Sequence, residues 1–179
     1  MKRREREAVV TTLIDELDKR GSWCGETHVQ KAMFFVQEMA EVDLGFDFIL
    51  YKHGPFSFDL RDELTAMRAD LLLDLEVRAL GYGPRLRPMK NAWAMVKRYR
   101  DTVERVRPRI QFVAERFGDR PVTELERLGT ALYVARRKKP GETPETQAQE
   151  IHRLKPHVSV EQAREALQTV RSWEAELPS

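Results

Sequence analysis

The chain has a single cysteine, Cys24, and lacks the sequence features of disulfide-rich, zinc-binding or membrane-spanning proteins. One cysteine excludes a disulfide framework within the 179 residues and any cysteine-rich zinc module. No apolar run approaches the ~20 residues of a membrane-spanning helix, and the charged start MKRRERE leads into no apolar signal-peptide core. No glycine-rich phosphate loop, G-x-S-x-G elbow or D-x-D-type acidic cluster is present. These absences favour a cytoplasmic, non-enzymatic protein without cofactor or metal.

The cysteine and the histidines are the remaining candidates for catalysis or metal binding. Cys24 lies close enough in sequence to His28 to suggest a thiol–imidazole pair. A lone cysteine beside Trp23 is more typical of a small packing residue, and we expect His28 to lie exposed in a first helical turn. His152 and His157 lack the i, i+4 spacing that one helix face offers to a metal. A hydrolase that uses Cys24 and His28 is therefore only a minor alternative.

The start of the chain is predicted to form two helices and a strand. The first twenty residues carry apolar side chains at helical spacing, and Gly21 follows where a helix would stop. A second helix is predicted to begin at Thr27, with a capping box to Gln30, and to form the centre of the core. Alternating residues over 46–51 predict a short strand, which should end at Gly54-Pro55 because proline cannot donate a ladder hydrogen bond.

A third helix and a β-hairpin are predicted next. Ser57 or Asp59 is placed to cap a helix that runs to Asp70. The alternation of apolar and charged residues over 73–79 predicts a half-buried strand, and Arg85-Leu86-Arg87 is a plausible return strand. The segment Gly81-Tyr82-Gly83-Pro84 would form the turn between them.

The second half of the chain is predicted to be helical. Pro108 should kink its first helix or mark where that helix starts. Later helices are predicted to start at a capping box of Thr123 and Glu126, at Thr143-Pro144, and at a second capping box of Ser159 and Gln162.

The order of these elements is that of a winged-helix domain. We therefore expect a mostly α protein, with a winged-helix-like domain over residues 1–100. That domain would hold three helices, a short strand and a β-hairpin wing. Residues 101–179 would form a helical extension packed on it, so that the chain makes one compact body.

Positive and negative residues occupy different segments of the chain, although the net charge is only +2. Residues 21–77 hold 4 Lys/Arg against 11 Asp/Glu, whereas residues 78–120 hold 12 against 4. The two blocks can neutralise each other in the fold, or the basic block can be the footprint of a partner surface. The expected third helix carries four carboxylates against two arginines, and such a surface is repelled by DNA phosphates.

Nucleic acid and protein both remain open as partners. Nucleic acid would be bound by the basic hairpin and the residues after it, which mix cations with aromatic rings. The expected contacts are Tyr82, Arg85, Arg87, Lys90, Lys97, Arg98 and Arg100. The expected contacts of a protein partner are Lys52, His53, Arg61 and Arg68. We favour a non-enzymatic binding or regulatory protein. Whether it forms a homodimer, and whether it would recognise a particular nucleic-acid sequence, stays open.

Four stretches carry a resemblance to known families: VQKAMFF at 29–35, YKHGPFSFDL at 51–60, LERLGTALY at 125–133 and LKPHVS at 154–159. Through them the chain resembles the YwgA-like proteins of bacteria and archaea and, more distantly, the Panacea (SocA-like) domain of antitoxins. The first resemblance implies a fold and no reaction. The second implies neutralisation of a toxin through protein contact, so an antitoxin or a defence-system accessory subunit is the alternative function.

Overall fold

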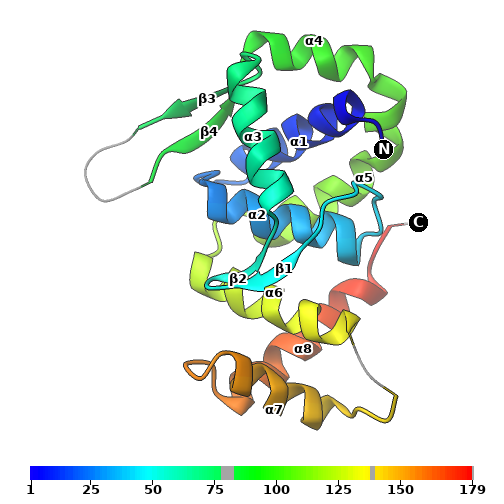
Figure 1. The fold of residues 1–179 in the computed structure, drawn as a ribbon. Helices are drawn as coiled ribbons and strands as arrows, with labels where there is room; N and C mark the ends of the chain where they lie inside the picture. The colour runs from blue at the N-terminus through cyan, green and yellow to red at the C-terminus, as the bar shows by residue number, and fades with distance from the viewer. Residues whose placement is uncertain (78–82, 138–139, 179) are drawn as a thin grey trace.

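The structure is a computed structural model that describes residues 1–77, 83–137 and 140–178. The described chain is mostly helical, as predicted, with two small antiparallel sheets (Figure 1). The helices are α1 (Arg3–Asp18), α2 (Glu26–Phe34), α3 (Phe58–Ala69), α4 (Lys90–Arg98), α5 (Arg100–Phe117), α6 (Val122–Arg136), α7 (Pro144–Leu154) and α8 (Val160–Ala175). A π-helical turn, η1 (Phe35–Met39), continues α2. Among the described helices, none has the length and apolarity to cross a membrane.

The two sheets are hairpins in different parts of the molecule. Strands β1 (Ile49–Tyr51) and β2 (Gly54–Phe56) form one, and β3 (Leu73–Glu76) and β4 (Arg85–Pro88) form the other. The β3–β4 hairpin projects from the side of the helical body, whereas β1–β2 lies against α6 (Figure 1). The predicted strand at 73–79 is confirmed from Leu73 to Glu76, and the return strand at 85–87 is confirmed.

Helix α2 and η1 form the centre of the core, as predicted. They cross the middle of the molecule between α1 and α5 on one side and α6 and α8 on the other (Figure 1). Phe34 and Phe35 are fully buried, and the Phe35 ring lies 4.9 Å from that of Phe117 and 5.9 Å from that of Trp173. Burying one such side chain contributes roughly 1.5–3 kcal/mol. The ring contacts of Phe35 in η1 thus join α5, through Phe117, and α8, through Trp173, to the centre of the core.

The predicted capping box at the start of α2 is wrong. The N-cap is Gly25, which is bridged to Arg85 of β4, so the helix begins before Thr27. Gln30 is fully buried, and its side-chain amide must find partners inside the protein. It donates to the carbonyl of Ser57 and accepts from the Ser57 N–H, both at 2.9 Å. A side chain assigned to local capping therefore holds a distant segment against α2.

Gly54 and Pro55 do not end the strand but form its return partner. In the hairpin Leu50 is opposite Pro55 and Tyr51 is opposite Gly54. Every second N–H of a two-stranded hairpin points away from the partner strand, so proline is tolerated there. Gly54 has φ +82°, a conformation that side-chain-bearing residues rarely adopt. The predicted strand over 46–51 is correspondingly reduced to Ile49–Tyr51.

The remaining predictions of helix starts are partly right. The side chains of Ser57, Thr143 and Ser159 accept N-cap hydrogen bonds, as predicted. Helix α6 begins after Pro121 without a capping bond from Thr123, so that capping box is wrong. Helix α5 runs through Pro108 from a start at Arg100, and α4 lies where we predicted no element.

Candidate functional site

Two of the carboxylates on α3 and its C-cap, Glu63 and Asp70, are paired with the first turns of α1 and not with the basic block. Arg6 lies 2.7 Å from Glu63, and Arg4 lies 3.0 Å from Asp70. Arg3 reaches both carboxylates, at 3.1 and 3.5 Å. Because these two carboxylates are engaged by α1, they do not pair with the cations of residues 83–120.

The arginines of the β3–β4 hairpin are held within the chain to different degrees. Arg85 lies 3.1 Å from Glu76 and 3.3 Å from Asp18, covers the Trp23 ring at 5.3 Å, and is only 19% exposed. Arg87 also pairs with Glu76, at 3.2 Å, but its side chain is 63% exposed. Arg85 is therefore a structural residue more than an open cation, in contrast to what we expected. Tyr82, the expected stacking residue, lies outside the described residues.

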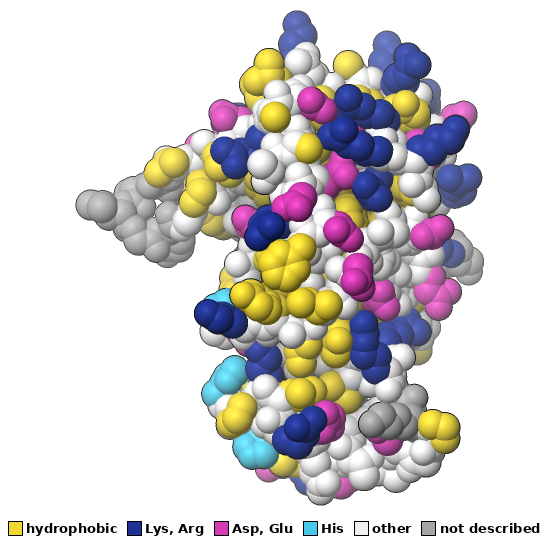
Figure 2. All heavy atoms as spheres, in the orientation of Figure 1, with side chains coloured by type: hydrophobic (Ala, Val, Ile, Leu, Met, Phe, Trp, Pro, Cys, Tyr) yellow, Lys and Arg dark blue, Asp and Glu magenta, His cyan; other side chains and the backbone are white. Residues whose placement is uncertain are grey.

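The other expected nucleic-acid contacts are open to solvent. Lys90, Lys97, Arg98 and Arg100 are exposed on α4 and at the start of α5, and Arg105 is exposed one turn further on. In the part of the chain that the structure describes, none of the five forms an ion pair. We call these residues the α4–α5 basic surface. Lys and Arg side chains gather in this region of the molecule, over α4, the start of α5 and the start of α1 (Figure 2).

A buried charge cluster joins the β1–β2 hairpin to α2, α6 and the end of α7. Lys31 of α2 is 1% exposed, and its Nζ donates to the carbonyl of Pro55 at 2.8 Å. Lys155 donates to the carbonyls of Tyr51, at 3.0 Å, and Lys52, and its Nζ lies 3.1 Å from the carboxylate of Glu126. Burial lowers the pKa of Lys31 to about 8, with Lys155 adding to the shift and Glu126 opposing it. Both lysines thus hold the hairpin through its backbone carbonyls.

Two histidines lie at the solvent side of this cluster. His53 lies 3.6 Å and His157 lies 3.9 Å from Glu126, and both rings are largely exposed. We refer to Lys31, His53, Glu126, Lys155 and His157 together as the Glu126 cluster. Lys52 and His53, the expected protein contacts on the hairpin, are both exposed at its tip.

Glycine allows the hairpin to approach α6 closely. A Cβ on Gly129 would lie 3.0 Å from the ring of Pro55, and one on Gly54 would lie 3.2 Å from the Glu126 carbonyl. All four stretches that carry the family resemblance therefore meet here, through Lys31, Pro55, Glu126 and Lys155. We did not predict this cluster. The sequence feature that indicates it is Lys31, a charged residue inside the apolar helical run VQKAMFF.

Cys24 and His28 are both buried and are engaged separately. The Cys24 thiol donates to the carbonyl of Ile14 at 3.4 Å, and burial raises its pKa to about 11. His28 is 6% exposed and its ring lies 6.0 Å from that of Phe117, so the expectation of an exposed histidine is wrong. A buried thiol with a raised pKa is a poor nucleophile because the thiolate is the reactive form. This geometry favours the packing role of Cys24 over the thiol–imidazole pair.

The expected protein contacts on α3 lie on its exposed face. Arg61 pairs with Asp62 at 3.0 Å and lies 5.0 Å from the centre of the Phe58 ring. Arg68 is exposed in the last turn of the helix, next to its final residue, Ala69.

Neither a metal centre nor a known family can be assigned to these features. Within residues 1–77, 83–137 and 140–178, no three His, Cys, Asp or Glu side chains are grouped so that they could hold a metal ion. The resemblance to YwgA-like and Panacea proteins stays a prediction. No family model matches the chain, and no significant match is found among curated proteins.

Proposed function

We propose that this protein binds nucleic acid through the phosphate backbone, along the α4–α5 basic surface. The observation that carries the proposal is the contrast between paired and unpaired cations. The arginines of α1 and Arg85 are engaged by carboxylates, whereas five exposed cations on α4 and α5 have no ion pair among the described residues. Phosphate contacts dominate the affinity of proteins for nucleic acids and need such free cations.

Helix α4 has the composition of a nucleic-acid contact surface. Only Ala92 of this helix is buried, so most of its length faces solvent. Lys90, Trp93 and Lys97 recur every three to four residues and therefore lie along one side of the helix. Trp93 is 42% exposed and is available to stack on a base. Cations interleaved with an aromatic ring favour binding of backbone and bases without a requirement for sequence.

A winged-helix-like arrangement of the first hundred residues is part of the same proposal. Helices α1, α2 and α3 are followed by the β3–β4 hairpin, in the order that a winged helix has, with β1–β2 inserted before α3. The third helix of such a domain ordinarily enters the major groove. Here Asp59 and Asp62 are exposed on α3 and would repel phosphates. We therefore infer that the α4–α5 basic surface, and not α3, contacts the nucleic acid.

Charge-neutral substitutions on this surface test the proposal. We expect the double variant Arg98→Gln, Arg100→Gln to bind a fluorescently labelled duplex at least tenfold more weakly than the wild type at low salt, by fluorescence anisotropy. The control is Arg153→Gln, Arg164→Gln, which removes two exposed arginines from α7 and α8 and changes the net charge equally. Equal losses in the two variants would show a general effect of charge and would contradict a site on α4–α5.

A protein-binding function is the second candidate, and an exposed aromatic cluster favours it. Ile49, Tyr51 and Phe58 are exposed, and the ring of Phe58 lies 5.1 Å from that of Phe56 and 5.7 Å from that of Tyr51. Arg61 packs over the same ring. Tyrosine, arginine and clustered apolar side chains are typical of the centres of protein interfaces.

This second candidate is tested by the stoichiometric recovery of one partner protein. The variant Tyr51→Ser, Phe58→Ser should lose a partner that the wild type retains. Substitution of Val77, which is exposed outside this cluster, should leave that partner bound. Loss of the partner in both variants, or in neither, would contradict a role for the aromatic cluster.

A further inference from the structure

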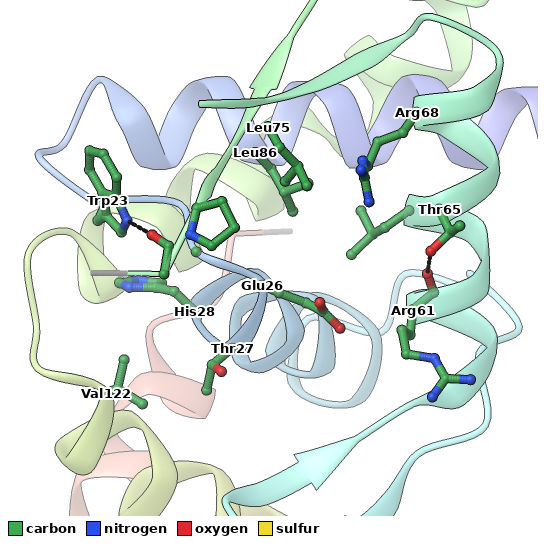
Figure 3. Close-up of a pocket in the computed structure, with 14 residues that line it drawn as sticks. Trp23, Glu26, Thr27, His28, Arg61, Thr65, Arg68, Leu75, Leu86 and Val122 are labelled. Carbon is green, nitrogen blue, oxygen red and sulfur yellow. Dashed lines mark hydrogen bonds between the residues drawn. The ribbon is translucent and has the colours of Figure 1, made fainter. Parts of the chain in front are cut away.

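A cavity of about 420 Å³ lies between the start of α2, the exposed side of α3 and the β3–β4 hairpin (Figure 3). Its volume falls in the range of roughly 300–1,000 Å³ that is usual for small-molecule sites. Trp23, Leu64, Leu75 and Leu86 supply apolar surface to it, and Val122 approaches from α6. Apolar walls from four separate parts of the chain thus enclose a space of ligand size.

The polar groups of the cavity favour a negatively charged ligand. Arg68 of α3 is directed into the space (Figure 3), and in the described residues it has no ion pair. The N-cap of α2 is Gly25, so no side chain caps the N–H groups of the first turn, at the positive end of the helix dipole. Arg61, which also lines the cavity, already pairs with Asp62. Glu26, on the same first turn, supplies one opposing charge.

His28 provides an independent indication of a ligand. Its side chain lines the cavity, is 94% buried and lies at the end away from Arg68 (Figure 3). Its Nε2 atom has no hydrogen-bond partner among the described residues. A buried polar atom without a partner costs roughly 1–3 kcal/mol, so such atoms are normally satisfied. Because Nε2 is closed to solvent in the present orientation of the ring, a polar group of a bound molecule would satisfy it once the ring turns toward the cavity.

We propose that this cavity binds a small monoanionic organic acid with a flat apolar body. The acid group lies at Arg68, the body packs against Trp23 and the three leucines, and a polar substituent or water carried with the ligand reaches His28. A single acid group is favoured because Glu26 opposes a second one. The proposal does not depend on the α4–α5 basic surface, whose residues do not line the cavity.

The probe pair is 2-naphthoate and 2-naphthamide, which share a flat body and differ in charge. We expect naphthoate to bind saturably with a stoichiometry near one by isothermal titration calorimetry at low salt, and the amide to bind at least tenfold more weakly. Arg68→Gln should weaken naphthoate binding about tenfold or more, because a charge-assisted hydrogen bond is lost. The control Arg164→Gln, on α8, should leave naphthoate binding unchanged.

A second pair of variants tests whether naphthoate binds in this cavity, and neither variant removes a charge. Thr65 lines the cavity and donates to the carbonyl of Arg61, four residues earlier, and Thr169 of α8 makes the same bond to Glu165. Thr65→Trp should fill the cavity and abolish naphthoate binding, whereas Thr169→Trp should preserve it. Absence of naphthoate binding at millimolar concentration, equal affinity for the amide, or full binding by Thr65→Trp would overturn the proposal.

Discussion

Replacing Glu126 with glutamine should destabilise the protein strongly, because it removes the only carboxylate of the Glu126 cluster. Lys31 and Lys155 are both buried, and breaking a buried ion pair by removing one partner typically costs ~3–5 kcal/mol. The cost of leaving Lys31 without Glu126 cannot exceed the cost of removing its proton. Because the pKa of Lys31 is about 8, removing that proton at pH 7 costs about 1.4 kcal/mol. We therefore expect Glu126→Gln to lower the free energy of unfolding by ~2–4 kcal/mol.

Urea unfolding at two pH values measures this cost and identifies its source. The pKa of Lys31 is lowered by folding, so the penalty for its charge is present below about pH 8 and is relieved as pH rises toward its unfolded value of 10.5. At about pH 9.5 Lys31 is already neutral in the wild type, and the loss of Glu126 should cost ~1 kcal/mol less than at pH 7. The control is Glu124→Gln, on the same helix as Glu126. It removes a partly exposed ion-pair partner of Arg120 and should cost less than ~1 kcal/mol of stability. Equal costs for Glu126→Gln and Glu124→Gln would refute the reasoning.

Two further predictions concern buried positions. Burial lowers the pKa of His28 to about 4, so stability should fall by up to ~3 kcal/mol as pH drops from about 6.5 to 4, because only the unfolded chain binds the proton there. His28→Phe should lose this pH dependence in urea unfolding, and an unchanged slope would contradict the burial of His28. Gly129→Ala should destabilise by ~1–2 kcal/mol in thermal unfolding, because contact with Pro55 outweighs the better helix propensity of alanine. In the control Gly83→Ala the added Cβ meets no neighbouring atom, so the substitution should have little effect on stability. A stabilised Gly129→Ala would contradict the prediction, because it would show that Pro55 moves away from the added Cβ at little cost.

Local patterns in the sequence predicted much of the fold. Ser57 and Ser159 cap their helices as predicted, and Ser159 forms the predicted capping box with Gln162. Thr27 and Thr123 stand in the same local pattern and do not, because Gly25 is held by β4 and Pro121 precedes α6. A capping pattern indicates where a helix can begin, and long-range contacts determine the residue at which it does begin.

The candidate sites were predictable only where they depend on exposed charge. Lys97, Arg98 and Arg100 belong to a basic block that is evident in the sequence, and they are exposed as expected. Arg85 belongs to the same block but is engaged by Asp18, 67 residues away, which no local pattern shows. The Glu126 cluster and the cavity beside His28 likewise depend on residues brought together by folding.

The most direct test of the proposed function is the salt dependence of duplex binding. Each phosphate contact contributes a slope of about −0.9 in the logarithm of affinity against the logarithm of salt concentration. Wild-type protein should show a steep negative slope, and Arg98→Gln, Arg100→Gln should make it shallower by ~1.8, the share of two contacts. An affinity independent of salt, or a slope unchanged by the two substitutions, would contradict binding through the α4–α5 basic surface.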